Sequence, residues 1–360
     1  MKTDLPGNFT PCGIGSLPYR EPGPALKLIR ECLPAIPHWP QLPLRGHEEH
    51  FLFQSLAPLI RLGLIKEEEG AMPYFTALED GWTERLTAFY GFYLQLEEGG
   101  MEALSGFSIP ERAAVGFYAF LQDLEAQGTG EARFLKGQVA GPVTAGLYLT
   151  DGTGRPAFYE PQLRDLLVKT TALQARWQIQ QLSRFGLPVI IFVDDPAISA
   201  YGTSGHVAIQ WQDLVEALKE IAGAIIAGGG IPGVHSCSGV EWPIFFEAGY
   251  RIVSLDAYNF FTSLLVFASE VKTFLKEGGV LAWGLVPTYE QAWKETPMSL
   301  SRRLEEYFEA LARRGVPGEL LLKQALITPT CGTGTLEPEL AEHIYRLTAE
   351  LAGYLQQNKI

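Results

Sequence analysis

Residues 189–197 read VIIFVDDPA, a run of five apolar residues that leads into two aspartates and a proline. An apolar, largely β-branched run of this length that ends at a turn is typical of a strand buried on both faces. Similar short runs recur along the chain, with longer helix-like stretches between them. Strands that alternate with helices in this way predict βαβ units and a parallel sheet.

Seven further segments have the pattern of strands. They are Cys12–Leu17, Met72–Phe75, Lys136–Ala140, Gly233–Cys237, Arg251–Leu255, Gly279–Trp283 and Ala325–Thr328, of which Met72–Phe75 has the weakest pattern. Helices are predicted at residues 162–185, 211–227 and 300–314, in the longer stretches between the predicted strands. In residues 300–314 the apolar positions recur at helical spacing, which is typical of an amphipathic helix. Together with residues 189–193 this makes eight strands, the number in a closed parallel barrel.

The predicted fold is therefore α/β, a single (β/α)8 TIM barrel domain spanning residues 1–360, with an N-terminal extension and lid loops. A barrel core takes about 250 residues, and the 360-residue chain contains neither a Ser/Pro-rich linker nor a sharp shift in composition. The Pro-rich segment 34–43, which includes Trp39, is predicted to be a loop or lid. The stretch Gly13-Ile14-Gly15 lacks the third glycine of a dinucleotide fingerprint, so it is weak evidence for such a cofactor.

Composition narrows the classes of partner. The 28 basic and 41 acidic side chains give a net charge of −13, and no basic cluster occurs, so nucleic acid is not an expected partner. Met1–Thr10 lacks the apolar core of a signal peptide, and the apolar stretch 221–231 is too short to span a bilayer. We therefore expect a cytoplasmic protein with no membrane partner.

Four cysteines are too few for a disulfide framework, and Cys12 and Cys32 are interpreted as structural.

Polar or thiol residues follow several of the predicted strands. Asp194 ends the first quoted run, His235 and Cys237 end the next, Asp256 follows the strand after that, and Cys331 follows the last. The carboxyl ends of parallel strands meet at one mouth of a barrel, where chemistry is placed. Residues two apart on a strand face the same side, so we expect His235 and Cys237 to point into this mouth together.

A histidine, two thiolates and at most one carboxylate match the ligand preferences of zinc, which predicts a metal site at His235, Cys237, Asp256 and Cys331. The alternative is a pair of buried cysteines that pack as small hydrophobic residues beside a hydrogen-bonded histidine. No HExxH helix supplies a base for metal-assisted hydrolysis. Zinc with two cysteine ligands is suited to bind and deprotonate a substrate thiol, whose free pKa is about 8.5, so thiol alkylation is the predicted chemistry.

At these residues the chain resembles the catalytic C-terminal barrel of cobalamin-independent methionine synthase, within the wider uroporphyrinogen-decarboxylase-like superfamily, over nearly its whole length. The matching stretches are Ile14–Pro18, Gly141–Thr144, Val193–Ala197, His235–Cys237 and Pro329–Gly332. The resemblance implies zinc ligands at His235, Cys237, Asp256 and Cys331. It also implies that Gly15 and Ser16 hold the carboxylate of an amino-acid thiol such as homocysteine, and that Asp194 holds its amine.

The chain departs from the family pattern at several positions. Asp256 stands where the family usually has a glutamate, so Glu241 or Glu247 is an alternative fourth ligand, and Asp195 also replaces a glutamate. The loop 283–288 lacks the histidine that serves the long enzymes as an acid, and 360 residues leave no room for their second, folate-holding barrel. A folate amine needs protonation to leave, whereas a corrinoid does not. The departures therefore favour a methyl-corrinoid protein as the methyl donor.

Other functions stay open at this point. A sister methyltransferase would use another thiol, such as coenzyme M, as the acceptor. A metal-free decarboxylase of the uroporphyrinogen type would need an arginine-lined cleft for its carboxylates; the N-terminal third offers Arg20, Arg30, Arg45 and Arg61 but no arginine-rich motif at a strand end. A zinc-holding accessory protein without catalysis is the fourth possibility.

Overall fold

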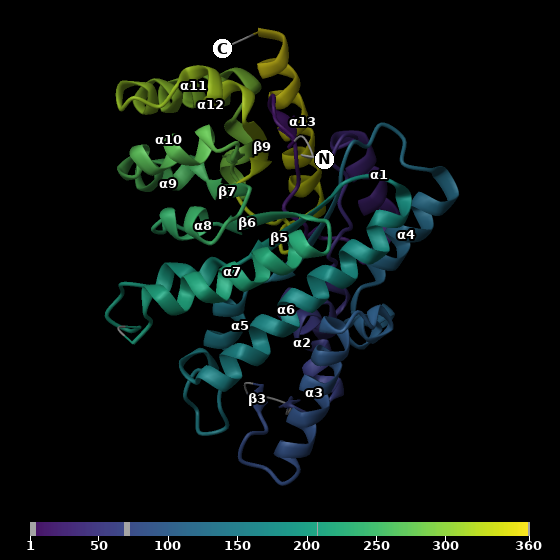
Figure 1. The fold of residues 1–360 in the computed structure, drawn as a ribbon. Helices are drawn as coiled ribbons and strands as arrows, with labels where there is room; N and C mark the ends of the chain where they lie inside the picture. The colour runs from purple at the N-terminus through teal and green to yellow at the C-terminus, as the bar shows by residue number, and fades with distance from the viewer. Residues whose placement is uncertain (1–4, 68–72, 207, 359–360) are drawn as a thin grey trace.

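The central feature of the protein is a curled, seven-stranded sheet in which each strand is parallel to its neighbours (Figure 1). The computed structural model describes residues 5–67, 73–206 and 208–358. The strand order is β1-β9-β8-β7-β6-β5-β4. The strands are β1 (Thr10–Pro11), β4 (Leu135–Ala140), β5 (Val189–Asp194), β6 (Ile231–Ser236), β7 (Ile252–Asp256), β8 (Val280–Val286) and β9 (Ala325–Pro329).

Helices connect the strands and pack around the outside of the sheet (Figure 1). They are α1 (Pro22–Cys32), α2 (Phe51–Arg61), α3 (Trp82–Glu97), α4 (Val115–Gln127), α5 (Pro142–Tyr148), α6 (Pro161–Leu182), α7 (Trp211–Ala227), α8 (Pro243–Glu247), α9 (Ala257–Val266), α10 (Ala268–Lys276), α11 (Pro297–Arg313), α12 (Gly318–Lys323) and α13 (Pro338–Asn358). The alternation of strands and helices confirms the predicted α/β class. Helices α6, α7 and α11 also lie where the three helical stretches were predicted.

The strands form because their residues are apolar on both faces. Every residue of β4, β6, β7, β8 and β9 is buried, as expected for parallel strands covered on one side by helices and on the other by the interior of the curl. One apolar cluster inside the curl includes Cys12, Ile190, Phe192, Ile252 and Leu326. A larger cluster fills the space between the sheet and the helices. The space inside the curl and the space between the sheet and the helices are therefore both packed.

Two of the eight predicted strands are wrong as members of this sheet. The first strand is Thr10–Pro11 rather than Cys12–Leu17, although Cys12 continues alongside β9 by donating its backbone N–H to Ile327 O over 2.9 Å. In Met72–Phe75, Met72 lies outside the described residues, and Tyr74–Phe75 forms β3, which pairs antiparallel with β2 (Ile65–Lys66) in a separate two-stranded sheet. Because β3 belongs to this separate pair, the main sheet has seven assigned strands and not the predicted eight.

The Pro-rich segment 34–43 is not a lid, because residues 36–42 are buried between the two edges of the main sheet. Trp39 N donates to Lys136 O over 3.4 Å and Lys136 N donates to Pro37 O over 3.0 Å, on the side of β4. On the other side, Gln41 N donates to Gly15 O over 3.0 Å. Pro37 and Pro40 have no N–H group, so the segment cannot form a regular ladder even though it is extended between two edges.

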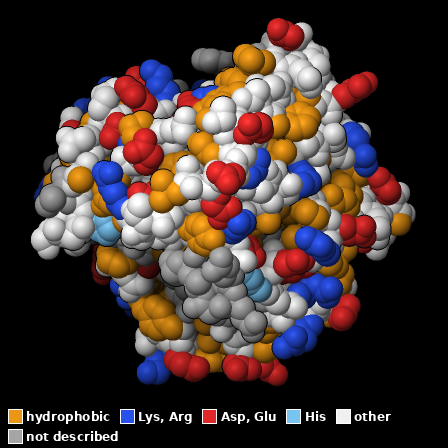
Figure 2. Space-filling view, turned by 90° about the horizontal axis from the view of Figure 1, so that it is seen from below, with side chains coloured by type: hydrophobic (Ala, Val, Ile, Leu, Met, Phe, Trp, Pro, Cys, Tyr) orange, Lys and Arg blue, Asp and Glu red, His pale blue; other side chains and the backbone are white. Residues whose placement is uncertain are grey.

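The surface gives no sign of segregated charge on the face shown in Figure 2. There, acidic and basic side chains of the described residues are mixed with apolar ones. None of the described helices is both long and apolar enough to cross a lipid bilayer.

Candidate metal centre

Three side chains meet at the carboxyl ends of the strands. The ligand atoms of His235, Cys237 and Cys331 all lie within 4.8 Å of one another. His235 is on β6, Cys237 follows that strand, and Cys331 follows β9. Strands β7 and β8 lie between β6 and β9 in the sheet, so the curl of the sheet is what brings the third residue to the other two. The structure thus brings together three of the four predicted ligands.

His235 is held so that one ring nitrogen remains available. The side chain is 3% exposed, and its Nδ1 lies 3.0 Å from Ser254 Oγ, which is beside it on β7. Its Nε2 is buried and has no hydrogen-bond partner among residues that the structure describes. A metal-ligating histidine almost always uses its other nitrogen in this way, because the second hydrogen bond fixes the tautomer and the ring orientation. The buried Nε2 therefore fits a metal ligand.

The two thiols interact directly. The pKa of Cys237 is lowered to about 4 because the neighbouring Cys331 thiol and the His235 ring stabilise its thiolate. The pKa of Cys331 is raised, since it keeps the shared proton and is largely buried. Two sulfurs bound to a tetrahedral zinc at about 2.3 Å would lie about 3.8 Å apart, which fits within the observed spacing. Two soft thiolates and an imidazole are a donor set that suits zinc.

Asp256, the predicted fourth ligand, is not part of this three-residue cluster. It is 5% exposed at the end of β7, and its two oxygens accept from Asn259 N over 2.9 Å and Asn259 Nδ2 over 2.7 Å. Its carboxylate thereby caps α9. Burial raises the pKa of Asp256, and the negative charge of Cys237 adds to this effect. Asp256, which is shorter than the glutamate usual in the resembled family, thus caps α9 and is not one of the clustered ligand candidates.

The alternative glutamates do not join the cluster either. Glu241 and Glu247 are both exposed. Glu247 Oε2 accepts from Trp211 Nε1 over 3.1 Å, and Glu241 lines a pocket beside that indole. The part of the chain that the structure describes thus supplies three protein ligands within the 4.8 Å cluster.

The residues predicted to hold a substrate carboxylate lie against the loop that carries Cys331. Ser16 Oγ accepts from Gly334 N over 3.1 Å, and Ser16 O accepts from Thr333 N over 3.1 Å. A Cβ at Gly332 would lie 2.3 Å from Ser16 Oγ, so this close approach requires glycine next to the thiol. The space around Gly15 is also restricted, because a Cβ there would lie 2.9 Å from Gln138 Cδ.

The two consecutive aspartates have different environments. Asp195 is fully buried and accepts from Val143 N over 3.1 Å, Thr144 N over 2.7 Å and Thr144 Oγ1 over 2.5 Å, so it fixes the start of α5. Asp194 pairs in register with His235, and its Oδ1 is buried with no hydrogen-bond partner in the described structure. Burial raises the pKa of Asp194 to about 6. An unpaired buried acceptor is costly, which indicates that Asp194 is available to a ligand.

Sequence reasoning missed the role of Lys136. Its side chain is 0% exposed inside the curl, where Nζ donates to Ile14 O over 2.6 Å and lies 4.4 Å from the centroid of the Phe192 ring. Burial lowers the pKa of Lys136, while the charge of Asp194 opposes that effect. The signal in the sequence was the presence of a lysine inside a predicted strand, Lys136–Ala140. Its hydrogen bond supports the carbonyl that immediately precedes Gly15.

Comparison with protein-family models gives no match, and comparison with curated proteins gives none either. The class of protein is therefore defined by its fold and site alone. It is an α/β protein with a curled parallel sheet and a candidate His/Cys/Cys metal centre at the carboxyl ends of the strands.

Proposed function

We propose that this protein is a zinc-dependent enzyme that transfers a methyl group to a thiol, with homocysteine as the acceptor and methionine as the product. The observation that carries the proposal is the convergence of His235, Cys237 and Cys331, all within 4.8 Å, at the carboxyl ends of the strands. Catalytic zinc sites keep a position for substrate beside three protein ligands. The likeness of the sequence motifs to those of methionine synthase supports the same assignment.

We also propose that the fold is a closed (β/α)8 barrel. Seven strands are assigned, and the buried segment 36–42 occupies the position of the eighth between β4 and the residues after β1. Its backbone hydrogen bonds to Lys136 and to Gly15 support this closure. Catalytic residues of such barrels lie at the carboxyl ends of the strands, as the three candidate ligands do here.

Each candidate ligand has a distinct part in the proposed reaction. Cys237 and Cys331 would hold the metal as thiolates, and His235 would hold it through Nε2 while Ser254 keeps the ring in place. When bound, zinc supplies a Lewis acid that keeps a substrate thiol in its thiolate form at neutral pH. The hydrogen-bonded position of Asp256 on Asn259 leaves the fourth ligand place to that thiol.

The remaining polar groups suit an amino-acid thiol. The unpartnered Oδ1 of Asp194 would accept from the substrate ammonium, which removes the penalty of leaving that oxygen unpaired. The backbone and hydroxyl near Gly15 and Ser16 would receive the substrate carboxylate beside the Cys331 loop. Coenzyme M has no ammonium group, so Asp194 favours homocysteine over this alternative acceptor.

The loop after β8 supports a corrinoid rather than a folate as the methyl donor. Residues 283–288 contain no histidine, whereas the long methionine synthases carry a histidine acid in the corresponding loop; Thr288 donates its backbone N–H to Thr330 Oγ1 over 3.1 Å, and their two hydroxyls lie 3.0 Å apart. A threonine hydroxyl is too weak an acid to protonate a leaving amine. Transfer from a methyl-corrinoid needs no proton. The substrate sulfur forms a bond to the methyl carbon, the cobalt–carbon bond breaks, and its electron pair stays on cobalt as cob(I)alamin.

The decarboxylase alternative finds less support. It requires free arginines that face a cleft, but Arg30 pairs with Asp123 at 2.6 Å and Arg45 pairs with Glu49 at 3.1 Å. It also gives no role to the three candidate metal ligands.

The test is an anaerobic assay of the zinc-loaded protein with methylcobalamin as the minimal donor. Homocysteine and coenzyme M are compared as acceptors, and methyltetrahydrofolate replaces methylcobalamin in parallel reactions. We expect methionine to form from homocysteine and methylcobalamin only when zinc is bound. Methionine formed from methyltetrahydrofolate alone would overturn the assignment of the donor, and equal rates without zinc would overturn the proposed chemistry.

A further inference from the structure

A cavity that contains none of the three clustered metal-ligand candidates in its lining is formed in part by residues 239–241, which follow Cys237 in the sequence. Its volume is about 240 Å³, and its walls come from five segments. These are η7 (Pro196–Ala200) with the residue after it, the start of α7, the loop between β6 and α8, α8 itself, and α9. The cavity is smaller than the roughly 300–1,000 Å³ typical of drug-sized ligands, so it suits a compound of a few heavy atoms.

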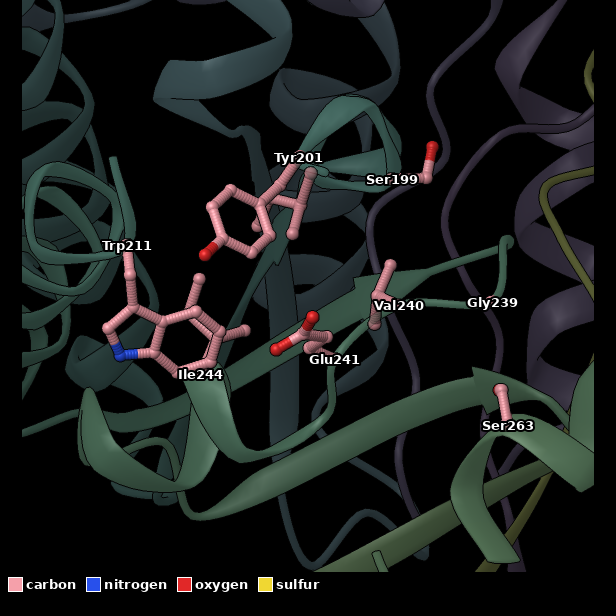
Figure 3. Close-up of a pocket in the computed structure, with 9 residues that line it drawn as sticks. Ser199, Tyr201, Trp211, Gly239, Val240, Glu241, Ile244 and Ser263 are labelled. Atoms are coloured by element: carbon pink, nitrogen blue, oxygen red, sulfur yellow. The ribbon is translucent and has the colours of Figure 1, made fainter. Parts of the chain in front are cut away.

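The walls combine aromatic rings with one carboxylate. Figure 3 shows the rings of Tyr201 and Trp211 on one side of the pocket and the Glu241 carboxylate directed towards them. The ring centroids are 5.7 Å apart and the ring planes meet at 58°, so the rings form two adjoining walls. Ile198, Val240 and Ile244 add apolar surface. The described lining residues include no lysine or arginine.

The two serine hydroxyls and the indole N–H of the lining already have partners. Ser199 Oγ donates to Pro196 O over 2.9 Å, and Ser263 Oγ donates to Phe260 O over 2.7 Å. Glu247 accepts from the Trp211 indole N–H, which leaves the indole with its π face as its means of binding a ligand. Glu241 forms no ion pair with any described residue and is the one charged group in the described lining.

We infer that this pocket binds a small alkylammonium cation, with Glu241 as the counter-ion and the Tyr201 and Trp211 rings as cation–π partners. Aromatic faces attract quaternary ammonium groups through their negative quadrupole, and an adjacent carboxylate adds a charge–charge attraction. A metal cation such as Ca²⁺ fits poorly, because it needs six to eight oxygen ligands. The inference does not depend on the proposed methyl transfer, since none of His235, Cys237 and Cys331 lines the pocket.

The test is calorimetric titration of the full-length protein with choline and with its neutral isostere 3,3-dimethylbutanol, at constant ionic strength. We expect choline to bind saturably and about tenfold more tightly than the isostere, in keeping with a cation–π and charge contribution. Glu241→Gln and Trp211→Leu should each weaken choline binding about tenfold. Glu216→Gln is the matched control, because Glu216 is an exposed carboxylate on the same helix as Trp211 but outside the pocket lining.

Several outcomes would overturn the inference. Choline and the isostere binding equally would remove the role of the charge, and no saturable heat with choline would remove the site. Unchanged choline binding by Glu241→Gln, with an unchanged circular dichroism spectrum, would show that the carboxylate is not the counter-ion. Choline titration of a zinc-free Cys237→Ser variant gives a separate readout, because its result is expected to be unchanged even if the methyl-transfer proposal fails.

Discussion

Replacing Ser254 with alanine removes the hydroxyl that lies 3.0 Å from His235 Nδ1. Both side chains are buried, at 0% and 3% exposure, so solvent does not readily replace the lost partner. If Nε2 is a zinc ligand, the freed ring should lose its fixed tautomer and orientation. Partners of metal-bound histidines typically contribute about 10- to 100-fold in metal affinity, or about 1.4–2.7 kcal/mol. We expect a loss of zinc affinity in this range.

The assay is competition for zinc between the protein and a chromophoric chelator at pH 7, with unfolding by urea measured in parallel. Loss of the buried hydrogen bond should also lower the free energy of unfolding by about 1–3 kcal/mol. Ser236→Ala is the matched control, because Ser236 is buried on β6 next to His235 but its Oγ has no hydrogen-bond partner among the described residues. This control should leave zinc affinity unchanged.

The two measurements separate a metal ligand from a structural histidine. If Ser254→Ala lowers the stability of the zinc-free protein but leaves zinc affinity within twofold of the unmodified protein, His235 is a core residue and the assignment of Nε2 is wrong. The reasoning is also refuted if the Ser236 control loses zinc affinity to the same extent, because the effect would then come from general disturbance of β6.

Three further predictions concern the same site. Cys237→Ser should reduce the zinc content from one equivalent per chain to a small fraction, as measured by elemental analysis. Cys12→Ser changes a thiol in the apolar interior cluster and should retain the zinc. Equal zinc retention by both variants would exclude the site. In the zinc-free protein the pKa of Cys237 is lowered to about 4, so its thiolate persists above that pH and is lost only as pH falls through it. Its iodoacetamide alkylation rate should therefore be nearly constant from pH 6 to 8, whereas a tenfold fall per unit, as for an ordinary thiol of pKa about 8.5, would contradict this. Asp194→Asn should raise the KM for homocysteine about tenfold or more through loss of a charged hydrogen bond, with little change in the KM for coenzyme M, and equal changes in both would remove the amine contact.

The continuous apolar runs made most of the sheet predictable. Strands β5 to β9 begin and end within three residues of their predicted positions, because strands buried on both faces carry a strong apolar signal. The position of the Pro-rich segment was not predictable in the same way. Residues 36–42 are held by hydrogen bonds to both sheet edges, but Pro37 and Pro40 lack N–H groups and resemble loop residues in the sequence.

The candidate site was predictable where chemistry and strand position coincided. His235 and Cys237 share a face through their spacing of two, and Cys331 follows the last strand, so the topology alone brings them to one rim. The position of Asp256 could not be settled by that argument. Its carboxylate was equally placed to reach a metal or to cap the next helix, and the hydrogen bonds from Asn259 favour the cap.

This position of Asp256 affects the charge of the proposed centre. Two thiolates and a neutral imidazole would balance the two positive charges of zinc, so a substrate thiolate in the fourth place would make the complex anionic and leave its sulfur electron-rich. A carboxylate ligand would occupy that place or add a second negative charge. Moving Asp256 to the metal would break its two hydrogen bonds to Asn259, and such bonds to a charged group contribute about 1.5–3 kcal/mol each. The helix cap thus favours a three-ligand site that the substrate thiol would complete, which suits the proposed thiol alkylation.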